Sequence, residues 1–230
     1  MQKYNTVFLD ADETLFDFKK SEKAAFTATL EHFGFKATDA LTSLYHNIND
    51  GLWHEFEKGK ITQAQLGPER FRLFCEETGH NIDPVLMNQC YAGELGNYSY
   101  ILDGSVEFCS TLYKHCDLYI ITNGMPVAQH GRFDKSPLKP YFKNIYISQE
   151  IGCRKPEKAY FDAVFKDLSF KESDLKRSVI VGDSLTSDIL GGVNAGVDTI
   201  WYNPGSLPPR QDIVPTWTAK TYDEILNIIL

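Results

Sequence analysis

The sequence predicts an α/β fold: a parallel, Rossmann-like sheet core interrupted by an inserted α-helical domain. Two observations support this. After residue 103, short apolar runs alternate with helix-like segments, which is typical of parallel strands joined by right-handed crossovers. Before that, an apolar run at 5–9 is followed by a long stretch with helical spacing alone, so this first strand has to pair with the later ones. The helical block is therefore an insertion after the first strand.

The individual helices and strands are predicted from the spacing of apolar residues and from the residue types at the ends of each segment. Helices are expected in the insert near 17–33, 38–58, 62–78 and 83–96, where Thr38, Thr62 and Asp83 stand at N-cap positions. Strands are expected at 5–9, 118–121, 145–147, 179–181 and 199–202, with helices around 105–114, 157–168 and 187–195. We therefore assign residues 1–15 and 99–230 to the core that contains the sheet and 16–98 to a helical cap. Because the cap follows the end of the first strand, where open α/β sheets place their sites, we interpret it as a lid.

Composition narrows the functional classes. The chain has 230 residues, of which 43% are hydrophobic and 23% charged, values that exclude disordered and fibrous proteins. It has no run approaching the ~20 apolar residues of a membrane span, and the first strand follows Met1 too closely for a signal peptide, so we expect a cytoplasmic protein with reduced cysteines. The net charge of −8 argues against nucleic acids and acidic membranes as partners but allows a small anionic substrate. The sequence carries no signal of oligomeric state.

Asp10 and Asp12 stand where the first apolar run ends. In open α/β sheets, sites lie at the carboxyl ends of such strands. An EF-hand calcium loop is excluded because Thr14, Leu15 and Ser21 occupy positions that require Asp or Asn, Gly and Glu. A solvated acidic turn is the remaining structural alternative for these residues taken alone.

Three further polar clusters lie near the ends of predicted strands or the starts of predicted helices. Thr122 and Asn123 precede a glycine, a pattern that is also common in plain turns. Lys155 stands just before a helix that begins after Pro156, where a cation and free backbone N–H groups together suit an anion; a solvated lysine is the alternative. Asp183 ends a buried strand as Asp10 does, whereas Asp188 could simply cap the helix that follows.

Together these clusters predict a metal-assisted phosphoryl site. Asp10 and Asp183 would bring two carboxylates into one crevice, and at ~4 Å and an effective dielectric constant near 20 they repel by about 4 kcal/mol. A hard divalent cation relieves that repulsion, and an all-oxygen ligand set favours Mg²⁺. Lys155 and the Thr122 hydroxyl suit the oxygens of a phosphoryl group. The chain lacks the G-x-G-x-x-G, Walker A, G-x-S-x-G and H-E-x-x-H motifs of other enzyme classes.

These motifs, in this order, resemble those of the haloacid dehalogenase superfamily, and the helical insert resembles its C1-type cap. The residues concerned are Asp10-Ala-Asp12-Glu13-Thr14, Thr122-Asn123-Gly124, Lys155-Pro156 and Gly182-Asp183 with Asp188. Within the superfamily, the segments Gly51-Leu52-Trp53, Glu57–Thr62, Asp188–Gly192 and Pro215-Thr216-Trp217 are similar to those of bacterial pyrimidine 5′-nucleotidases. The resemblance implies an Mg²⁺-dependent phosphomonoesterase acting on nucleoside 5′-monophosphates.

The resemblance also implies roles for the residues. Asp10 would be the nucleophile that forms an aspartyl-phosphate, and Asp12 would protonate the leaving group and then activate water. Asp10, Asp183 and the backbone carbonyl of Asp12 would hold Mg²⁺, with Asp188 behind them or bound through water. The phosphoryl oxygens would be held by the residues Thr122, Asn123 (through its backbone) and Lys155.

Substrate choice and competing functions stay open at this point. Phe16, Phe18 and Trp53 lie in or beside the insert and could contact a base or sugar, although aromatic residues on amphipathic helices more often pack in a core. The alternatives are a phosphatase or phosphomutase acting on sugar phosphates, a 2-haloacid dehalogenase, or a binding module without activity. The presence of both Asp12 and Asp183 disfavours the dehalogenase, since halide leaves without a proton or a metal.

Overall fold

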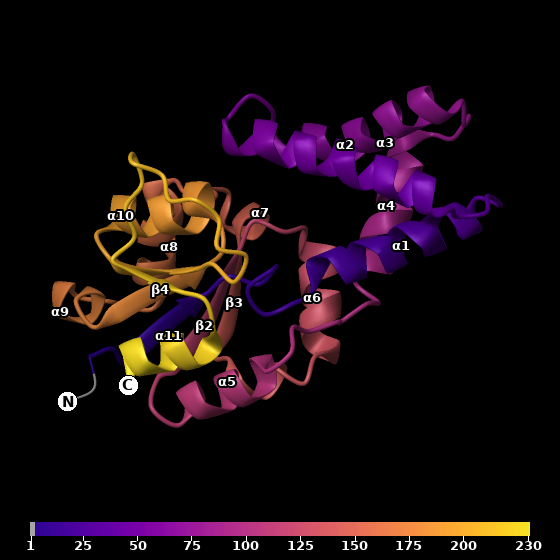
Figure 1. The fold of residues 1–230 in the computed structure, drawn as a ribbon. Helices are drawn as coiled ribbons and strands as arrows, with labels where there is room; N and C mark the ends of the chain where they lie inside the picture. The colour runs from indigo at the N-terminus through magenta and orange to yellow at the C-terminus, as the bar shows by residue number, and fades with distance from the viewer. Residues whose placement is uncertain (1–2) are drawn as a thin grey trace. The chain divides into compact units, whose positions relative to one another are not determined.

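The protein is built around a six-stranded, fully parallel sheet with strand order β3-β2-β1-β4-β5-β6, and the computed structural model describes residues 3–230 (Figure 1). This confirms the predicted α/β class. The strands are β1 (Thr6–Leu9), β2 (Asp117–Thr122), β3 (Asn144–Ile147), β4 (Ser178–Gly182), β5 (Asp198–Tyr202) and β6 (Trp217–Ala219). The strand order reverses beside β1, which is the topological switch point where α/β proteins place their sites.

The chain divides into two compact units, which we describe separately. The core unit comprises Met1–Asp17, Tyr100–Pro126 and Ser136–Leu230, and the helical unit comprises Phe18–Ser99 and Val127–Lys135.

Helices cover both faces of the sheet in the core unit. Alternate residues of β1 point to opposite faces, and Phe8 joins a cluster with Ile180 and with Phe161 and Phe165 of the helix α8. The helices α5 and α11 pack together on the other side of the sheet (Figure 1). The helical elements of this unit are α5 (Ser105–Tyr113), η1 (Lys139–Tyr141), α7 (Ser148–Ile151), α8 (Lys158–Asp167), α9 (Glu172–Leu175), the π-helical turn η2 (Leu185–Ile189), α10 (Leu190–Ala195) and α11 (Tyr222–Ile229).

The helical unit is a bundle in which α1 packs on α4, α4 on α3, and α3 on α2. Its helices are α1 (Phe18–His32), α2 (Asp39–Glu57), α3 (Gln63–Thr78), α4 (Pro84–Leu95) and most of α6 (Pro126–Lys135). The first four agree with the helices predicted for the insert. Thr38, Thr62 and Asp83 are the observed N-caps of α2, α3 and α4, respectively. Aromatic rings fill the interior, with Phe26 stacked on Tyr45 at a centroid distance of 4.0 Å.

One segment of the helical unit comes from outside the predicted insert. Residues 127–135 group with the helical unit, and the assignment of 1–15 and 99–230 to the core and 16–98 to the cap stays a prediction. The reason is local packing: the Ser99 hydroxyl donates to the Arg132 carbonyl at 2.9 Å, and Lys135 Nζ donates to the Asn97 side chain at 2.7 Å. Gly96 and Gly131 also let the two segments approach closely, since a Cβ at Gly131 would lie 2.7 Å from the Gly96 carbonyl oxygen.

Among residues 3–230, no helix is both long and apolar enough to cross a membrane.

Candidate active site

Three carboxylates meet at the carboxyl ends of the central strands. Asp10 directly follows β1, Asp183 directly follows β4, and these strands are neighbours with Leu9 opposite Val181. Asp188 comes from the π-helical turn η2, a type of turn often found at functional sites. One oxygen atom from each of the three side chains lies within 4.8 Å of the other two.

Lys155 joins two of these carboxylates from the centre of the cluster. Its Nζ donates to Asp10 Oδ1 at 2.5 Å, to Asp188 Oδ1 at 2.7 Å and to the carbonyl of Ile121 at 2.9 Å. Since an ammonium group has three N–H bonds, all of its donors have protein acceptors in this arrangement. The Lys155 side chain is 2% exposed, so these are buried, charge-assisted hydrogen bonds. Lys155 therefore holds Asp10 in place and offsets part of its charge.

Asp188 is fixed at both oxygens and depends on a glycine beside it. Its Oδ1 accepts from Lys155, and its Oδ2 accepts from the backbone N–H of Ser184 at 3.1 Å. A Cβ at Gly182 would lie 2.2 Å from Oδ2 of Asp188, so a side chain at Gly182 would displace the carboxylate. The structure thus places Asp188 as a support for Lys155.

The charges of the cluster are only partly balanced. Burial raises the pKa of Asp10 to about 7; Lys155 lowers it, but the charges of Asp188 and Asp12 add to the rise. Burial also raises the pKa of Asp183, and the charges of Asp10 and Asp188 act in the same direction. Burial alone would lower the pKa of Lys155, but the carboxylates of Asp10 and Asp188 outweigh it and hold the pKa above the usual lysine range. The lysine stays charged, whereas burial and mutual repulsion disfavour the charged forms of Asp10 and Asp183.

The repulsion between these carboxylates and their oxygen-only donors fit a divalent cation. Asp10 and Asp183 are the side chains whose charged forms are most penalised, and a hard cation between them would remove that penalty. The carbonyl of Asp183 is held by the indole Nε1 of Trp201 at 2.8 Å, which fixes the backbone behind this carboxylate. Carboxylate oxygens at such spacing are the ligands that Mg²⁺ prefers.

The side chain of Asn123, which follows β2, is hydrogen-bonded to the backbone of Lys155. Its Nδ2 donates to the Lys155 carbonyl at 2.9 Å, and its Oδ1 accepts from the Lys155 backbone N–H at 3.0 Å. The prediction for Asn123 concerned its backbone alone, so this clamp is an added role. The hydroxyl oxygen of Thr122, which is buried, accepts from the N–H of Gly124 at 3.0 Å and so shapes the turn after β2.

Asp12 and Phe16 belong to the core unit, whereas the aromatic candidates Phe18 and Trp53 belong to the helical unit. Asp12 lies in the loop after β1 and forms a backbone bridge with Phe16, which is buried in the core unit. Phe18 and Trp53 belong to the helical unit, where Phe18 lies 5.7 Å from the Arg132 guanidinium and Trp53 meets Phe56 edge-on at 5.4 Å.

Some contributors to the site escaped sequence reasoning. The carbonyl of Ile121 and the N–H of Ser184 are backbone groups, and their residue type carries no signal. Trp201 was included in a predicted strand, but nothing in the sequence marks its indole as a partner of the Asp183 carbonyl.

The family is shown by comparison with known proteins. Residues 4–196 match the family model described as haloacid dehalogenase-like hydrolase. The chain belongs to this family. The prediction of a hydrolase with this fold is therefore confirmed.

Several relatives are similar over nearly the whole chain. The HAD-hydrolase YfnB of Bacillus subtilis is 36% identical, covering 100% of this chain and 97% of YfnB. A crystal structure of YfnB bound to magnesium matches with a TM-score of 0.92 over 99% of both chains. The pyrimidine 5′-nucleotidases YjjG of Escherichia coli and PynA of Streptococcus pneumoniae are 33% and 32% identical, covering 99% and 98% of this chain and 98% and 95% of their own. These names are consistent with phosphoric monoester hydrolysis.

Proposed function

We propose that the protein is an Mg²⁺-dependent phosphomonoesterase that hydrolyses nucleoside 5′-monophosphates, with pyrimidine nucleotides preferred. The observation that carries the proposal is the buried Asp10–Lys155–Asp188 arrangement beside Asp183 at the switch point of the sheet. The choice of nucleotides is supported by the full-length similarity to two pyrimidine 5′-nucleotidases.

The first half-reaction transfers the phosphoryl group to Asp10. An Asp10 carboxylate oxygen attacks phosphorus while the bond from phosphorus to the 5′-oxygen breaks, and the Asp12 carboxyl gives its proton to that oxygen. Lys155 favours the ionised, attacking form of Asp10, since its positive charge opposes the rise in pKa that burial causes.

The second half-reaction frees the enzyme. Water attacks the phosphorus of the aspartyl-phosphate, Asp12 takes a proton from that water, and the bond to Asp10 breaks to release phosphate. Asp10, Asp183 and the Asp12 carbonyl would hold Mg²⁺, which neutralises negative charge at the phosphoryl group when it is bound. Thr122 and the Asn123 backbone would contact the phosphoryl oxygens, and Lys155 would do so by exchanging one of its three present acceptors for a phosphoryl oxygen.

The test is phosphate release from UMP, dUMP, dTMP, AMP, GMP and several sugar phosphates, each with Mg²⁺ or EDTA. We expect EDTA-sensitive release that is fastest with pyrimidine monophosphates and is lost in Asp10→Asn. Mg²⁺-dependent release confined to sugar phosphates would overturn the nucleotidase assignment. Isomerised sugar phosphate without net phosphate release would instead identify a mutase.

A further inference from the structure

The last helix of the chain contacts the loop that carries Asp12. Tyr222 is the first residue of α11, and its hydroxyl donates to the backbone carbonyl of Thr14 at 2.8 Å. Thr14 lies two residues after Asp12, so one side chain from the end of the sequence reaches the loop after β1. Both residues belong to the core unit.

The loop that receives this bond is tightly wound. The N–H groups of Leu15 and Phe16 both donate to the carbonyl of Ala11, at 3.0 and 2.9 Å, and the N–H of Glu13 donates to the Phe16 carbonyl at 2.9 Å. Glu13 adopts a φ of 57°, a left-handed conformation that a non-glycine residue keeps only when its surroundings hold it there. Such a loop needs fixed points on both sides of Glu13 to keep its shape.

The Thr14 carbonyl is one of these fixed points. Thr14 is fully buried, and a buried carbonyl that loses its partner costs about 1–3 kcal/mol. The Tyr222 hydroxyl meets that requirement, so the conformation of the loop at Thr14 depends on where this hydroxyl lies.

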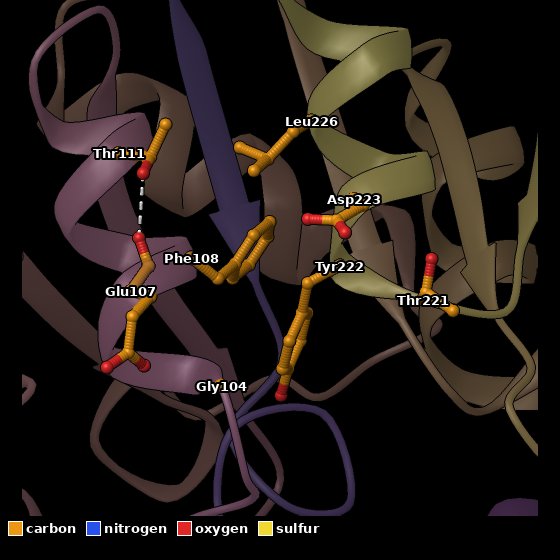
Figure 2. Close-up of a pocket in the computed structure, with 8 residues that line it drawn as sticks. All are labelled: Gly104, Glu107, Phe108, Thr111, Thr221, Tyr222, Asp223 and Leu226. Carbon is orange, nitrogen blue, oxygen red and sulfur yellow. Dashed lines mark hydrogen bonds between the residues drawn. The ribbon is translucent and has the colours of Figure 1, made fainter.

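The position of the hydroxyl is in turn fixed by stacked rings. The Tyr222 ring lies parallel to Phe108 of α5, with a centroid distance of 4.5 Å and an angle of 15°, and to Tyr202 of β5 at 5.2 Å and 9°. Figure 2 shows Tyr222 beside Phe108 at the start of α11. Both residues line a cavity of about 320 Å³. Three aromatic rings from three elements thus leave the hydroxyl little freedom to move.

We propose that Tyr222 is a positioning residue for Asp12: its hydroxyl fixes the loop so that the Asp12 carboxyl is held at the leaving group. The proposal rests on the role of Asp12 given under Proposed function. A misplacement of about 1 Å in a catalytic group can lower a rate by ~10²-fold, so a single hydrogen bond two residues away is enough to affect the rate.

The test compares two substrates that differ in their need for a proton. The leaving alkoxide of UMP requires protonation, whereas the phenolate of p-nitrophenyl phosphate leaves without it. The ratio kcat/KM reports steps up to the departure of the leaving group, before water attack. In Tyr222→Phe, which keeps the ring stack, we expect kcat/KM to fall ~10-fold for UMP and less than ~2-fold for p-nitrophenyl phosphate.

A matched control removes a different tyrosine hydroxyl. Tyr146 lies on β3, which β2 separates from β1, and its hydroxyl donates to Asp167 at 2.7 Å. In Tyr146→Phe, kcat/KM for UMP and for p-nitrophenyl phosphate should both stay within ~2-fold of wild type. In an Asp12→Asn background, adding Tyr222→Phe should cause no further loss for UMP, because the two residues act on one step. If Tyr222→Phe does not fold, Phe108→Leu, which loosens the stack and keeps the hydroxyl, should give the same selective loss.

The positioning role would be overturned if Tyr222→Phe lowered kcat/KM equally for both substrates or left kcat/KM for UMP unchanged. A further loss of kcat/KM for UMP when Tyr222→Phe is added to Asp12→Asn would also overturn it. Wild-type enzyme that is active on UMP and loses that activity in Asp12→Asn, with Tyr222→Phe unaffected, would refute this inference alone. Wild-type enzyme inactive on nucleotides would refute the proposed function instead.

Discussion

Lys155 lies between two buried carboxylates, and replacing it with a neutral side chain of similar length should strongly destabilise the core unit. In Lys155→Met, Asp10 and Asp188 lose the ammonium that bridges them at 2.5 and 2.7 Å. Their oxygens lie within 4.8 Å of each other, where two unit charges at an effective dielectric constant of 20 repel by about 3.5 kcal/mol. Removing one partner of a buried ion pair generally costs about 3–5 kcal/mol, and we expect a loss in that range.

The loss should grow with pH. Asp10 already has a pKa raised to about 7, and without Lys155 the pKa should rise further. A carboxyl whose pKa is higher in the folded than in the unfolded chain favours folding while it is protonated. That contribution is complete below the unfolded value near ~4 and is lost as the pH rises through the folded value. Lys155→Met should therefore be closest to wild type near pH 5 and least stable near pH 8.

The assay is urea unfolding followed by tryptophan fluorescence in EDTA, at pH 5 and pH 8. Lys158→Met is the matched control, because Lys158 pairs with Asp162 on the surface with 62% of its side chain exposed, and its loss should cost less than about 0.5 kcal/mol. Adding Asp188→Asn to Lys155→Met should restore part of the stability by removing one of the two facing charges. A loss below about 1 kcal/mol at pH 8, or no gain from Asp188→Asn, would refute this account of Lys155.

Three further predictions concern other parts of the chain. Gly182→Ala places a Cβ 2.2 Å from Asp188 Oδ2 and should lower kcat at least ~10-fold, measured by phosphate release. Asn123→Ala removes both hydrogen bonds to the Lys155 backbone and should cost about 1–3 kcal/mol in urea unfolding. Burial raises the pKa of Glu22, so its stabilising contribution is complete below about pH 4 and is lost as the pH rises through the folded value. Glu22→Gln should flatten the fall of thermal stability above pH 4.

The first two of these predictions have a control in the same protein. Gly205→Ala should leave kcat unchanged because, apart from its chain neighbours, no heavy atom lies within 4 Å of its added Cβ, and equal losses at both glycines would count against the steric explanation. Asn123→Asp keeps the acceptor but not the donor and should fall between wild type and Asn123→Ala. An unchanged pH slope in Glu22→Gln would mean that another group in the helical unit dominates the titration.

Most of the helices and strands could be predicted because their signals are local. The helices of the insert combine apolar spacing with caps such as Thr62, whose side chain and that of Gln65 form a capping box. The helix α11 was not predicted, although the sequence has a threonine at its N-cap position, Thr221, with Glu224 three residues later. In the structure the Thr221 side chain accepts from the Glu224 N–H at 3.2 Å. The strand β6 has three residues and lies at the edge of the sheet beside β5, so pairing with β5, rather than a local pattern, decides its existence.

The acids of the site were also predictable, because buried strands that end in carboxylates point to one edge of a parallel sheet. Asp10 and Asp183 come together for this reason. The connections between motifs were not predictable. The side-chain clamp from Asn123 to Lys155 and the bond from Tyr222 to Thr14 depend on tertiary packing, which brings together residues that are distant in sequence.

In the proposed reaction, Asp10 forms a covalent phosphoryl intermediate. The most direct measurement is acid quenching of the enzyme during turnover of a phosphorus-labelled nucleoside monophosphate with Mg²⁺, followed by peptide mapping. We predict hydroxylamine-sensitive label on the peptide that contains Asp10, and none in Asp10→Asn. Turnover that continues in Asp10→Asn, or label that maps to another residue, would contradict the account.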